Sequence, residues 1–290
     1  MPAPQQPAAP ERWFRTRPDS ATLTRPRLLA RSLIALHDLD EHISHYENLL
    51  GVPADLRMPI PDFGGLELAA VGHVLLIAGI RPFTPIQRQT RYSLIVPDLR
   101  QELDLLAATR TTVVEPPEPI LPGARARVRY PDAILAELVE HRPWRGEQPR
   151  PAMPGRRRAD LPETGVRLLP RHAVTDADFP AAVRLYEKLL RTPARTPSLT
   201  GPPMARTALV GNLLVVGLPG TAAVDPDQPR TALITSESAS ESASGTTVGT
   251  TAGAVLLAGD LSAEVWRGTV TTDCAPPPSA DRTRPGAAHA

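Results

Sequence analysis

The feature that most constrains the fold of this chain is an internal repeat. Tyr46–Leu50 (YENLL) matches Tyr186–Leu190 (YEKLL), and Val71–Ile77 matches Val210–Val216, so the copies lie 140 and then 139 positions apart. An offset that changes by one residue over several matches is hard to obtain by chance. We therefore predict two related halves, the second a duplicate of the first.

Within the first half, the hydrophobic pattern predicts the order βαβββ twice. Short alternating apolar runs bounded by Pro or Gly indicate strands, and an apolar stripe at Ile43, Tyr46 and Leu50 indicates a helix that begins near Asp38 and that Gly51 ends. The first unit is predicted as a strand at 29–36, the helix, and strands at 54–58, 65–71 and 74–78. The second is predicted as a strand at 91–96, a helix from 98, and strands at 112–114, 125–129 and 134–140.

Composition shifts predict five segments along the chain. Residues 1–26 are rich in Pro, Arg and Gln, so we expect a disordered arm, and the Pro-rich and Ala-rich residues 271–290 predict a disordered tail. The first domain is predicted at 27–143, a linker at 144–163 and the second domain at 164–270. The second copy is expected to be degenerate, because Ser236–Thr251 is a polar tract with no helical stripe and only 254–257 and 263–266 resemble strands after it.

Overall composition excludes several classes of partner. The 32 basic residues balance 31 acidic ones and form no stripe, so a nucleic-acid partner is not expected. The longest apolar stretch, 74–80, is too short to span a bilayer, so no membrane partner is expected either. A lone cysteine, Cys274, allows no intrachain disulfide and is typical of the cytoplasm. The 35 Pro and 19 Gly disfavour long helices, so we expect a strand-rich α+β fold.

Three motifs, in order, resemble the vicinal-oxygen-chelate superfamily of glyoxalases, bleomycin-resistance proteins and extradiol dioxygenases. They are Leu33–Asp40 (LIALHDLD), Tyr46–Gly51 (YENLLG) and Tyr130–His141 (YPDAILAELVEH), which resemble the first strand, first helix and last strand of that fold. The resemblance covers roughly residues 28–143. It implies paired βαβββ modules whose curled mixed sheet forms a cup, in which many members hold a divalent metal.

The resemblance also implies where metal ligands would lie, and the sequence has the wrong residues there. The four positions correspond to Arg31, Leu76, Arg91 and Glu137, of which Glu137 alone could bind a metal. A catalytic divalent ion needs roughly three protein ligands. In the second copy, Leu169 corresponds to the first position and no acid clearly corresponds to the last. We therefore expect no metal and no other cofactor, unless this alignment is displaced.

The candidate ligand-binding residues follow from the same alignment. Arg31 and Arg91 would place two permanent cations beside Glu137, where guanidinium groups could bind an anionic or oxygen-rich ligand. The alternative is that Glu137 forms a structural salt bridge with one of the arginines. Glu67 is a further candidate, although the sequence does not determine whether it lies on the face of the sheet that lines the cup. Tyr92 could stack on a flat ligand or fill the core.

Three functions remain open from the sequence. The first is a metal-independent protein that binds a small-molecule ligand in the cup. The second is a metal-dependent lyase, isomerase or dioxygenase of the same superfamily. The third is a structural or regulatory protein whose degenerate second copy covers the first as an intrachain pseudo-dimer, and a homodimer is also possible.

Overall fold

The first half of the chain forms one eight-stranded sheet in the order β2-β3-β4-β1-β5-β8-β7-β6. The computed structural model describes residues 19–60, 65–120, 123–142, 156–200, 205–219, 228–235, 250–251 and 254–270. Strands β1 and β5 are antiparallel neighbours at the centre, and each has a parallel partner, β4 and β8 respectively. The strands are β1 (Arg27–Ala35), β2 (Ala54–Ile60), β3 (Leu66–Val71), β4 (Val74–Gly79), β5 (Thr90–Ile95), β6 (Thr112–Ile120), β7 (Gly123–Arg129) and β8 (Leu135–Glu140).

The second half repeats this order with β10-β12-β13-β9-β14-β17-β16-β15, and β11 pairs with β17 off this path. Every strand of the first order has an equivalent in the second sheet, although β10, β15 and β16 have only two or three residues each. The place of the second helix, 236–249, lies outside the described residues. The strands are β9 (Arg167–Thr175), β10 (Ala194–Arg195), β11 (Ser198–Thr200), β12 (Arg206–Val210), β13 (Leu213–Leu218), β14 (Thr231–Thr235), β15 (Thr250–Thr251), β16 (Ala254–Leu256) and β17 (Ser262–Thr269).

The helices begin and end close to the predicted positions, with one addition, although the Asp38 side chain makes no cap hydrogen bond at the start of α2. Helix α2 (Leu39–Leu50) ends at Gly51, whose φ of 61° is the left-handed conformation that glycine adopts without strain. Helix α4 (Leu99–Ala107) begins at Asp98, whose carboxylate accepts from the backbone N–H of Gln101. In the second half, α5 (Phe179–Leu190) is the counterpart of α2. The sequence analysis missed the short α3 (Pro85–Gln89), which the capping box of Thr84 and Gln87 initiates.

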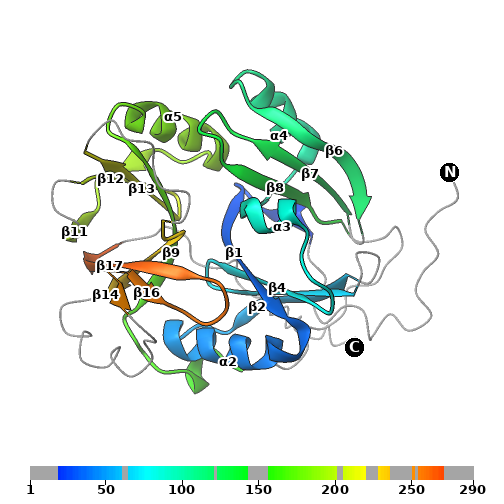
Figure 1. Cartoon of the computed structure of the whole chain (residues 1–290), viewed down its shortest axis with the longest axis vertical. Coiled ribbons are helices and arrows are strands. Elements are labelled where there is room, and N and C mark those ends of the chain that lie inside the picture. Colours follow the sequence, from blue (N-terminus) through cyan, green and yellow to red (C-terminus); the bar gives the residue numbers. More distant parts are fainter. Residues whose placement is uncertain are drawn as a thin grey trace, which may run out of the picture.

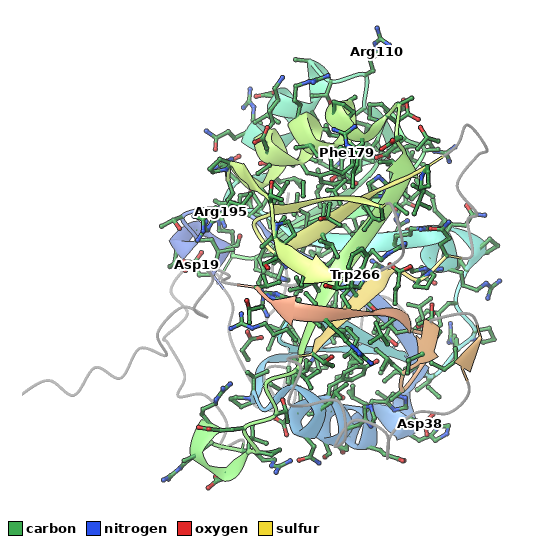
Figure 2. The ribbon with its side chains drawn as sticks, turned by 90° about the vertical axis from the view of Figure 1, so that its left-hand side faces the viewer. Asp19, Asp38, Arg110, Phe179, Arg195 and Trp266 are labelled. Atoms are coloured by element: carbon green, nitrogen blue, oxygen red, sulfur yellow. The ribbon has the colours of Figure 1, made fainter. Side chains whose placement is uncertain are left out.

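The predicted fold class, paired βαβββ modules forming a curled mixed sheet, is confirmed. Figure 1 shows the first-half strands on the right and the second-half strands on the left, with α2 at the bottom and α4 and α5 at the top. The long axis runs vertically in Figure 2, with Arg110 near one end, Trp266 near the middle and Asp38 near the other end. No helix among the described residues is long and apolar enough to cross a membrane.

Helix α2 is buried by both halves of the chain. Its residues Leu39, Ile43, Tyr46 and Leu50 share one apolar cluster with second-half residues that include Leu261. The Tyr46 hydroxyl donates to the carbonyl of Ala258 at 2.6 Å. The apolar face of α2 therefore covers the outer face of the second sheet as well as its own.

A second apolar cluster joins the halves at the other end. There α4 and the outer face of β5, β7 and β8 pack against α5, β12 and β13, and α4 touches α5 directly. Arg191, at the end of α5, pairs at 3.1 Å with the fully buried carboxylate of Glu102 on α4. Because the two halves bury each other's apolar helical faces, neither face is left to solvent.

Part of the segment assigned to the N-terminal arm, residues 19–26, contacts the first half. Ser20 is buried, and its hydroxyl and backbone N–H both donate to the His141 carbonyl. Residues 1–18 and 271–290 lie outside the described part of the chain. So does most of the predicted linker, although Arg158–Asp160 forms a 3-10 turn.

We predict that replacing Tyr46 by Phe destabilises the protein by about 0.5–1.5 kcal/mol, the usual net contribution of one intramolecular hydrogen bond. Tyr186→Phe is the matched control, because Tyr186 is also fully buried but its hydroxyl has no hydrogen-bond partner among the described residues. Urea unfolding of the two variants measures both effects. Equal destabilisation by the two changes would contradict the role assigned to the Tyr46 hydroxyl.

Candidate functional site

The cup of the first sheet is almost filled by its own side chains. Leu56, Leu75, Ile77 and Ile95 line it, together with an Arg and Glu cluster. The remaining cavity is only about 60 Å³, the volume of about two water molecules. Pockets for organic ligands usually measure about 300–1,000 Å³, so the cup as folded has no room for such a ligand.

Glu137 is the centre of the cluster in the cup. Its carboxylate lies 2.5 Å from Arg31, 3.1 Å from Arg125 and 3.3 Å from Arg127. Ser93, on the strand between β1 and β8, accepts from Arg31 and donates to Glu137. Arg125 and Arg127 also pair with Glu118 and Glu115 on β6. Three arginines and three glutamates thus form a neutral network across the cup floor.

The arginines decide the protonation state of Glu137. Burial alone would raise the pKa of this carboxyl, but the charges of Arg31, Arg127 and Arg125 outweigh burial and lower the pKa from its ordinary value of 4.5 to about 2. The side chain of Arg31 is only 3% exposed and that of Glu137 13%. Removing one partner of such a buried pair leaves the other charge uncompensated and typically costs about 3–5 kcal/mol.

The second half carries an equivalent pair. On the central strand of the first half, Ser93 is in register with Leu29 on β1 and Glu137 on β8. On the central strand of the second half, Ala232 is in register with Leu169 on β9 and Glu264 on β17. Glu264 therefore corresponds to Glu137. Arg171 pairs with Glu264 through two contacts, at 2.8 and 3.2 Å. The assignment of Leu169 to the first position and of no acid to the last was therefore wrong. Arg171 and Glu264 occupy those positions.

Two of the four positions at which metal ligands were expected, Leu76 on β4 and Arg91 on β5, do not face the cup. On β4, Leu75 and Ile77 face the cup, whereas Leu76 faces α2, because successive residues of a strand alternate faces. On β5, a register shift between Thr90 and Tyr92 interrupts the alternation at Arg91.

Correcting this alignment does not complete a metal site. Besides aliphatic side chains, the cup is lined by Gln87, Ser93, His141 and the three arginines around Glu137, so it offers one histidine and one carboxylate. Within the described ranges no three His, Cys, Asp or Glu side chains gather as a metal site would require. These residues do not fit the divalent metal that the superfamily often holds, since one histidine and one carboxylate already paired with three arginines fall short of the roughly three ligands that such an ion needs.

Three predicted site residues lie outside the cup. Arg91 does not join Glu137 and instead lines a pocket between the halves. Glu67 lies on the face opposite the cup and pairs with Arg57 at 2.6 Å. Tyr92 is fully buried in the core between the halves, where its hydroxyl donates to the Arg171 carbonyl, so it has no face available to a ligand. Of the predicted set, the structure brings only Arg31 and Glu137 together.

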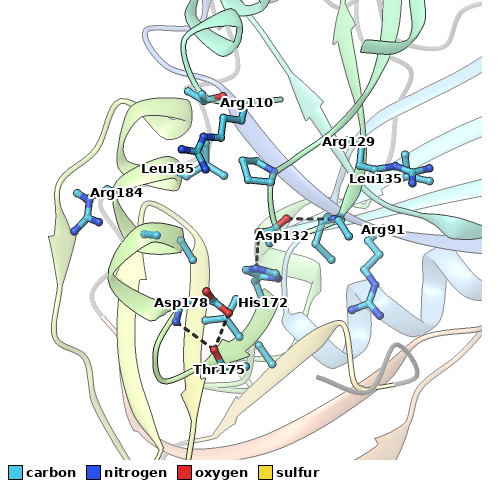
Figure 3. Close-up of a pocket in the computed structure, with 18 of the residues that line it drawn as sticks. Arg91, Arg110, Arg129, Asp132, Leu135, His172, Thr175, Asp178, Arg184 and Leu185 are labelled. Carbon is cyan, nitrogen blue, oxygen red and sulfur yellow. Dashed lines mark hydrogen bonds and ion pairs between the residues drawn. The ribbon is translucent and has the colours of Figure 1, made fainter. Parts of the chain in front are cut away.

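The larger pocket lies where the two halves meet. It has a volume of about 1000 Å³ and is bounded by the ends of β7 and α4 and the start of β5 from the first half, and by β9 and α5 from the second. Figure 3 shows Arg91, Arg129 and Asp132 around it from one half and His172, Asp178 and Arg184 from the other. Its basic side chains are Arg88, Arg91, Arg110, Arg129, Arg184, Lys188 and Arg230.

The side chains of His172 and Asp132 contact each other across the base of this pocket (Figure 3). His172 Nε2 lies 2.8 Å from Asp132 Oδ2, and the backbone N–H of Ile134 donates to the other carboxylate oxygen at 3.2 Å. Burial would raise the pKa of Asp132, but the hydrogen bond and charge of His172 lower it below its ordinary value. His172 is 2% exposed, and its Nδ1 has no hydrogen-bond partner among the described residues.

The sequence analysis did not identify His172 and Asp132 as site residues. They are 40 positions apart in different halves, and no motif spacing relates them. The Arg171–Glu264 pair could have been found, because Arg171 lies 140 positions after Arg31, the offset of the repeat.

Comparisons with known proteins add few constraints. No family model matches the chain, and no curated protein does. An uncharacterized protein from Methanosarcina mazei is 31% identical over 40% of this chain and 92% of its own, with a TM-score of 0.36. The 2,2',3-trihydroxybiphenyl 1,2-dioxygenase from Sphingomonas wittichii strain RW1 is 11% identical over 84% of this chain and 91% of its own, with a TM-score of 0.46. The 2,3-dioxygenase LapB from Pseudomonas sp. KL28 is 15% identical over 85% and 92%, with a TM-score of 0.42.

We predict that Glu137→Gln lowers the free energy of unfolding at neutral pH by about 3–5 kcal/mol and weakens its dependence on acid. Because the folded-state pKa of about 2 is below the ordinary 4.5, the wild-type network stabilises the fold fully above about pH 4.5 and loses this contribution as the pH falls towards 2. Unfolding curves between pH 6 and about pH 2 measure this. The exposed Glu163→Gln is the control, and a variant as acid-sensitive as wild type would refute the assignment.

Proposed function

We propose that this chain, which has the paired βαβββ fold of the vicinal-oxygen-chelate superfamily, is a metal-independent small-molecule-binding protein whose ligand occupies the pocket between its halves. The observation that carries the proposal is the pair of a first-strand arginine with a last-strand glutamate in each half, Arg31 with Glu137 and Arg171 with Glu264. These pairs occupy the floor on which the superfamily's metal would be expected. A small molecule would instead enter the pocket of about 1000 Å³.

The lining of this pocket suits an organic ligand with polar groups. Leu135, Val174 and Leu185 supply apolar wall, and Asp132 and His172 supply a fixed polar pair within it. Small-molecule sites usually combine apolar wall with convergent polar groups, and this pocket is more polar than most because charged side chains make up much of its lining. We therefore propose that the anionic or oxygen-rich ligand expected for the cup binds in this pocket instead, which Arg91 lines.

A second candidate function has a specific observation in its favour. Helix α2 covers the sheets of both halves, so the second half could serve only to stabilise the first as an intrachain pseudo-dimer. The two candidates differ in their response to a ligand screen, since a purely structural protein binds none of the compounds at the pocket.

Protein purified without chelator should contain well below one equivalent of Zn, Fe, Mn or Ni, measured by inductively coupled plasma mass spectrometry. The physical reason is that the arginine charges around Glu137 repel a cation. A metal-to-protein ratio near one, abolished by Glu137→Gln but kept in Glu163→Gln, would instead support the metal-dependent lyase, isomerase or dioxygenase.

We expect a thermal-shift screen of neutral and charged small molecules to yield binders that the pocket-filling change Ala181→Trp weakens about tenfold or more. Ala181 is exposed and lines the pocket, so an indole there should occupy ligand space without disturbing the core. Ala107→Trp adds the same bulk at an exposed position of α4 that does not line the pocket. Binders unaffected by Ala181→Trp would place the site elsewhere, and a screen without binders would favour the structural candidate.

A further inference from the structure

The charge of the pocket between the halves differs from that of the whole protein. The chain carries 32 basic and 31 acidic residues, which is nearly neutral. Of the residues that line the pocket, seven are Lys or Arg and two, Asp132 and Asp178, are acidic, an excess of five positive charges. The general abundance of arginine does not explain this concentration, because the same abundance elsewhere is matched by acidic residues.

Four of these cations are not engaged in structural ion pairs with the described residues. Within the described part of the chain, no carboxylate forms an ion pair with Arg110, Arg129, Arg184 or Lys188. The two acids are already engaged, since Asp132 pairs with His172, and Asp178 accepts a hydrogen bond from Thr175 at 2.7 Å. In Figure 3, Arg110, Arg129 and Arg184 are drawn without any interaction with the other residues shown. Such a group of like charges is repulsive until an anion neutralises it.

The cations come from both halves of the chain. Arg129 lies at the end of β7 and Arg110 just after α4, whereas Arg184 and Lys188 lie one helical turn apart on α5. Between them His172 lines the pocket, almost fully buried and with Nδ1 unpartnered among the described residues. A buried ring nitrogen without a partner is unfavourable in the empty pocket, and a ligand atom could supply its missing hydrogen bond.

We propose that the ligand of this pocket is a small organic anion with two or more phosphate groups, bound by arginines of both halves at once. This inference rests on the proposed function, whose binding pocket it uses. A phosphate carries up to two negative charges and accepts paired hydrogen bonds from a guanidinium, so two or three phosphates balance the excess charge. Neutralising it with carboxylates would take about five groups, which is many for a molecule that fits the pocket. The bound anion joins the halves and stabilises their contact.

Isothermal titration of the full chain with inorganic pyrophosphate tests this, with citrate as the polycarboxylate comparison. Pyrophosphate should bind more tightly than citrate, and it should raise the melting temperature. The double variant Arg129→Gln/Arg184→Gln removes one exposed cation from each half of the pocket and should weaken pyrophosphate binding about tenfold or more. The matched control Arg100→Gln/Arg158→Gln removes two exposed cations outside the pocket, one on α4 and one in the linker, and should change the affinity less than about twofold.

The outcomes separate this inference from the proposed function. Equal losses of pyrophosphate affinity in the two double variants would show unspecific attraction to a basic surface and would overturn the inference. Citrate binding as tight as that of pyrophosphate would also overturn it, and so would the absence of pyrophosphate binding at millimolar concentration. Neutral compounds whose binding Ala181→Trp weakens would leave the proposed function standing while refuting the phosphate ligand. A stoichiometric metal in the cup would refute the metal-independent function without bearing on pyrophosphate binding.

Discussion

The ion pair between the first and last strand of each half is the interaction on which the rest of this structure depends. Arg31 reaches Glu137, and Arg171 reaches Glu264, across the central strand that separates them. The arginine of each pair is buried and the glutamate is largely covered, with 13% and 16% of its side chain exposed, so the charges must compensate each other or destabilise the fold. The pairs close the concave face of the sheet with protein side chains. A cup closed in this way has little room for a metal or an organic ligand, and the space for binding must be sought elsewhere.

That space arises from how the halves pack. Each βαβββ module leaves an apolar outer face, and the faces bury one another around α2 at one end and around α4 and α5 at the other. At the α4 and α5 end the contact is incomplete, and the opening is lined by basic side chains from both halves. A site built in this way depends on the association of the halves, so ligand binding and the stability of their contact are thermodynamically linked.

The sequence predicted the fold better than the site. The alternation of apolar residues was enough to locate the strands of the first half along the chain, because this pattern is local, and the offset of the repeat then related the second half to the first. The β5 register shift displaced the assignment of Arg91, since an extra residue in a strand leaves no mark in an apolar pattern. Arg125 and Arg127 were placed in a strand, but the sequence did not say which face they occupy. The His172–Asp132 pair depends on the packing of the halves, which no local pattern encodes.

A double-mutant cycle on Arg171 and Glu264 tests the central claim most directly, because among the described residues no second arginine forms an ion pair with Glu264. The free energy of unfolding would be measured for Arg171→Met, Glu264→Gln and the double variant, with the more exposed Arg206 and Asp176, 3.7 Å apart, as the comparison cycle. The account predicts that the double variant loses about 1–3 kcal/mol less than the sum of the single losses, whereas the comparison pair is additive within about 0.5 kcal/mol. Additive losses at Arg171 and Glu264 would contradict it.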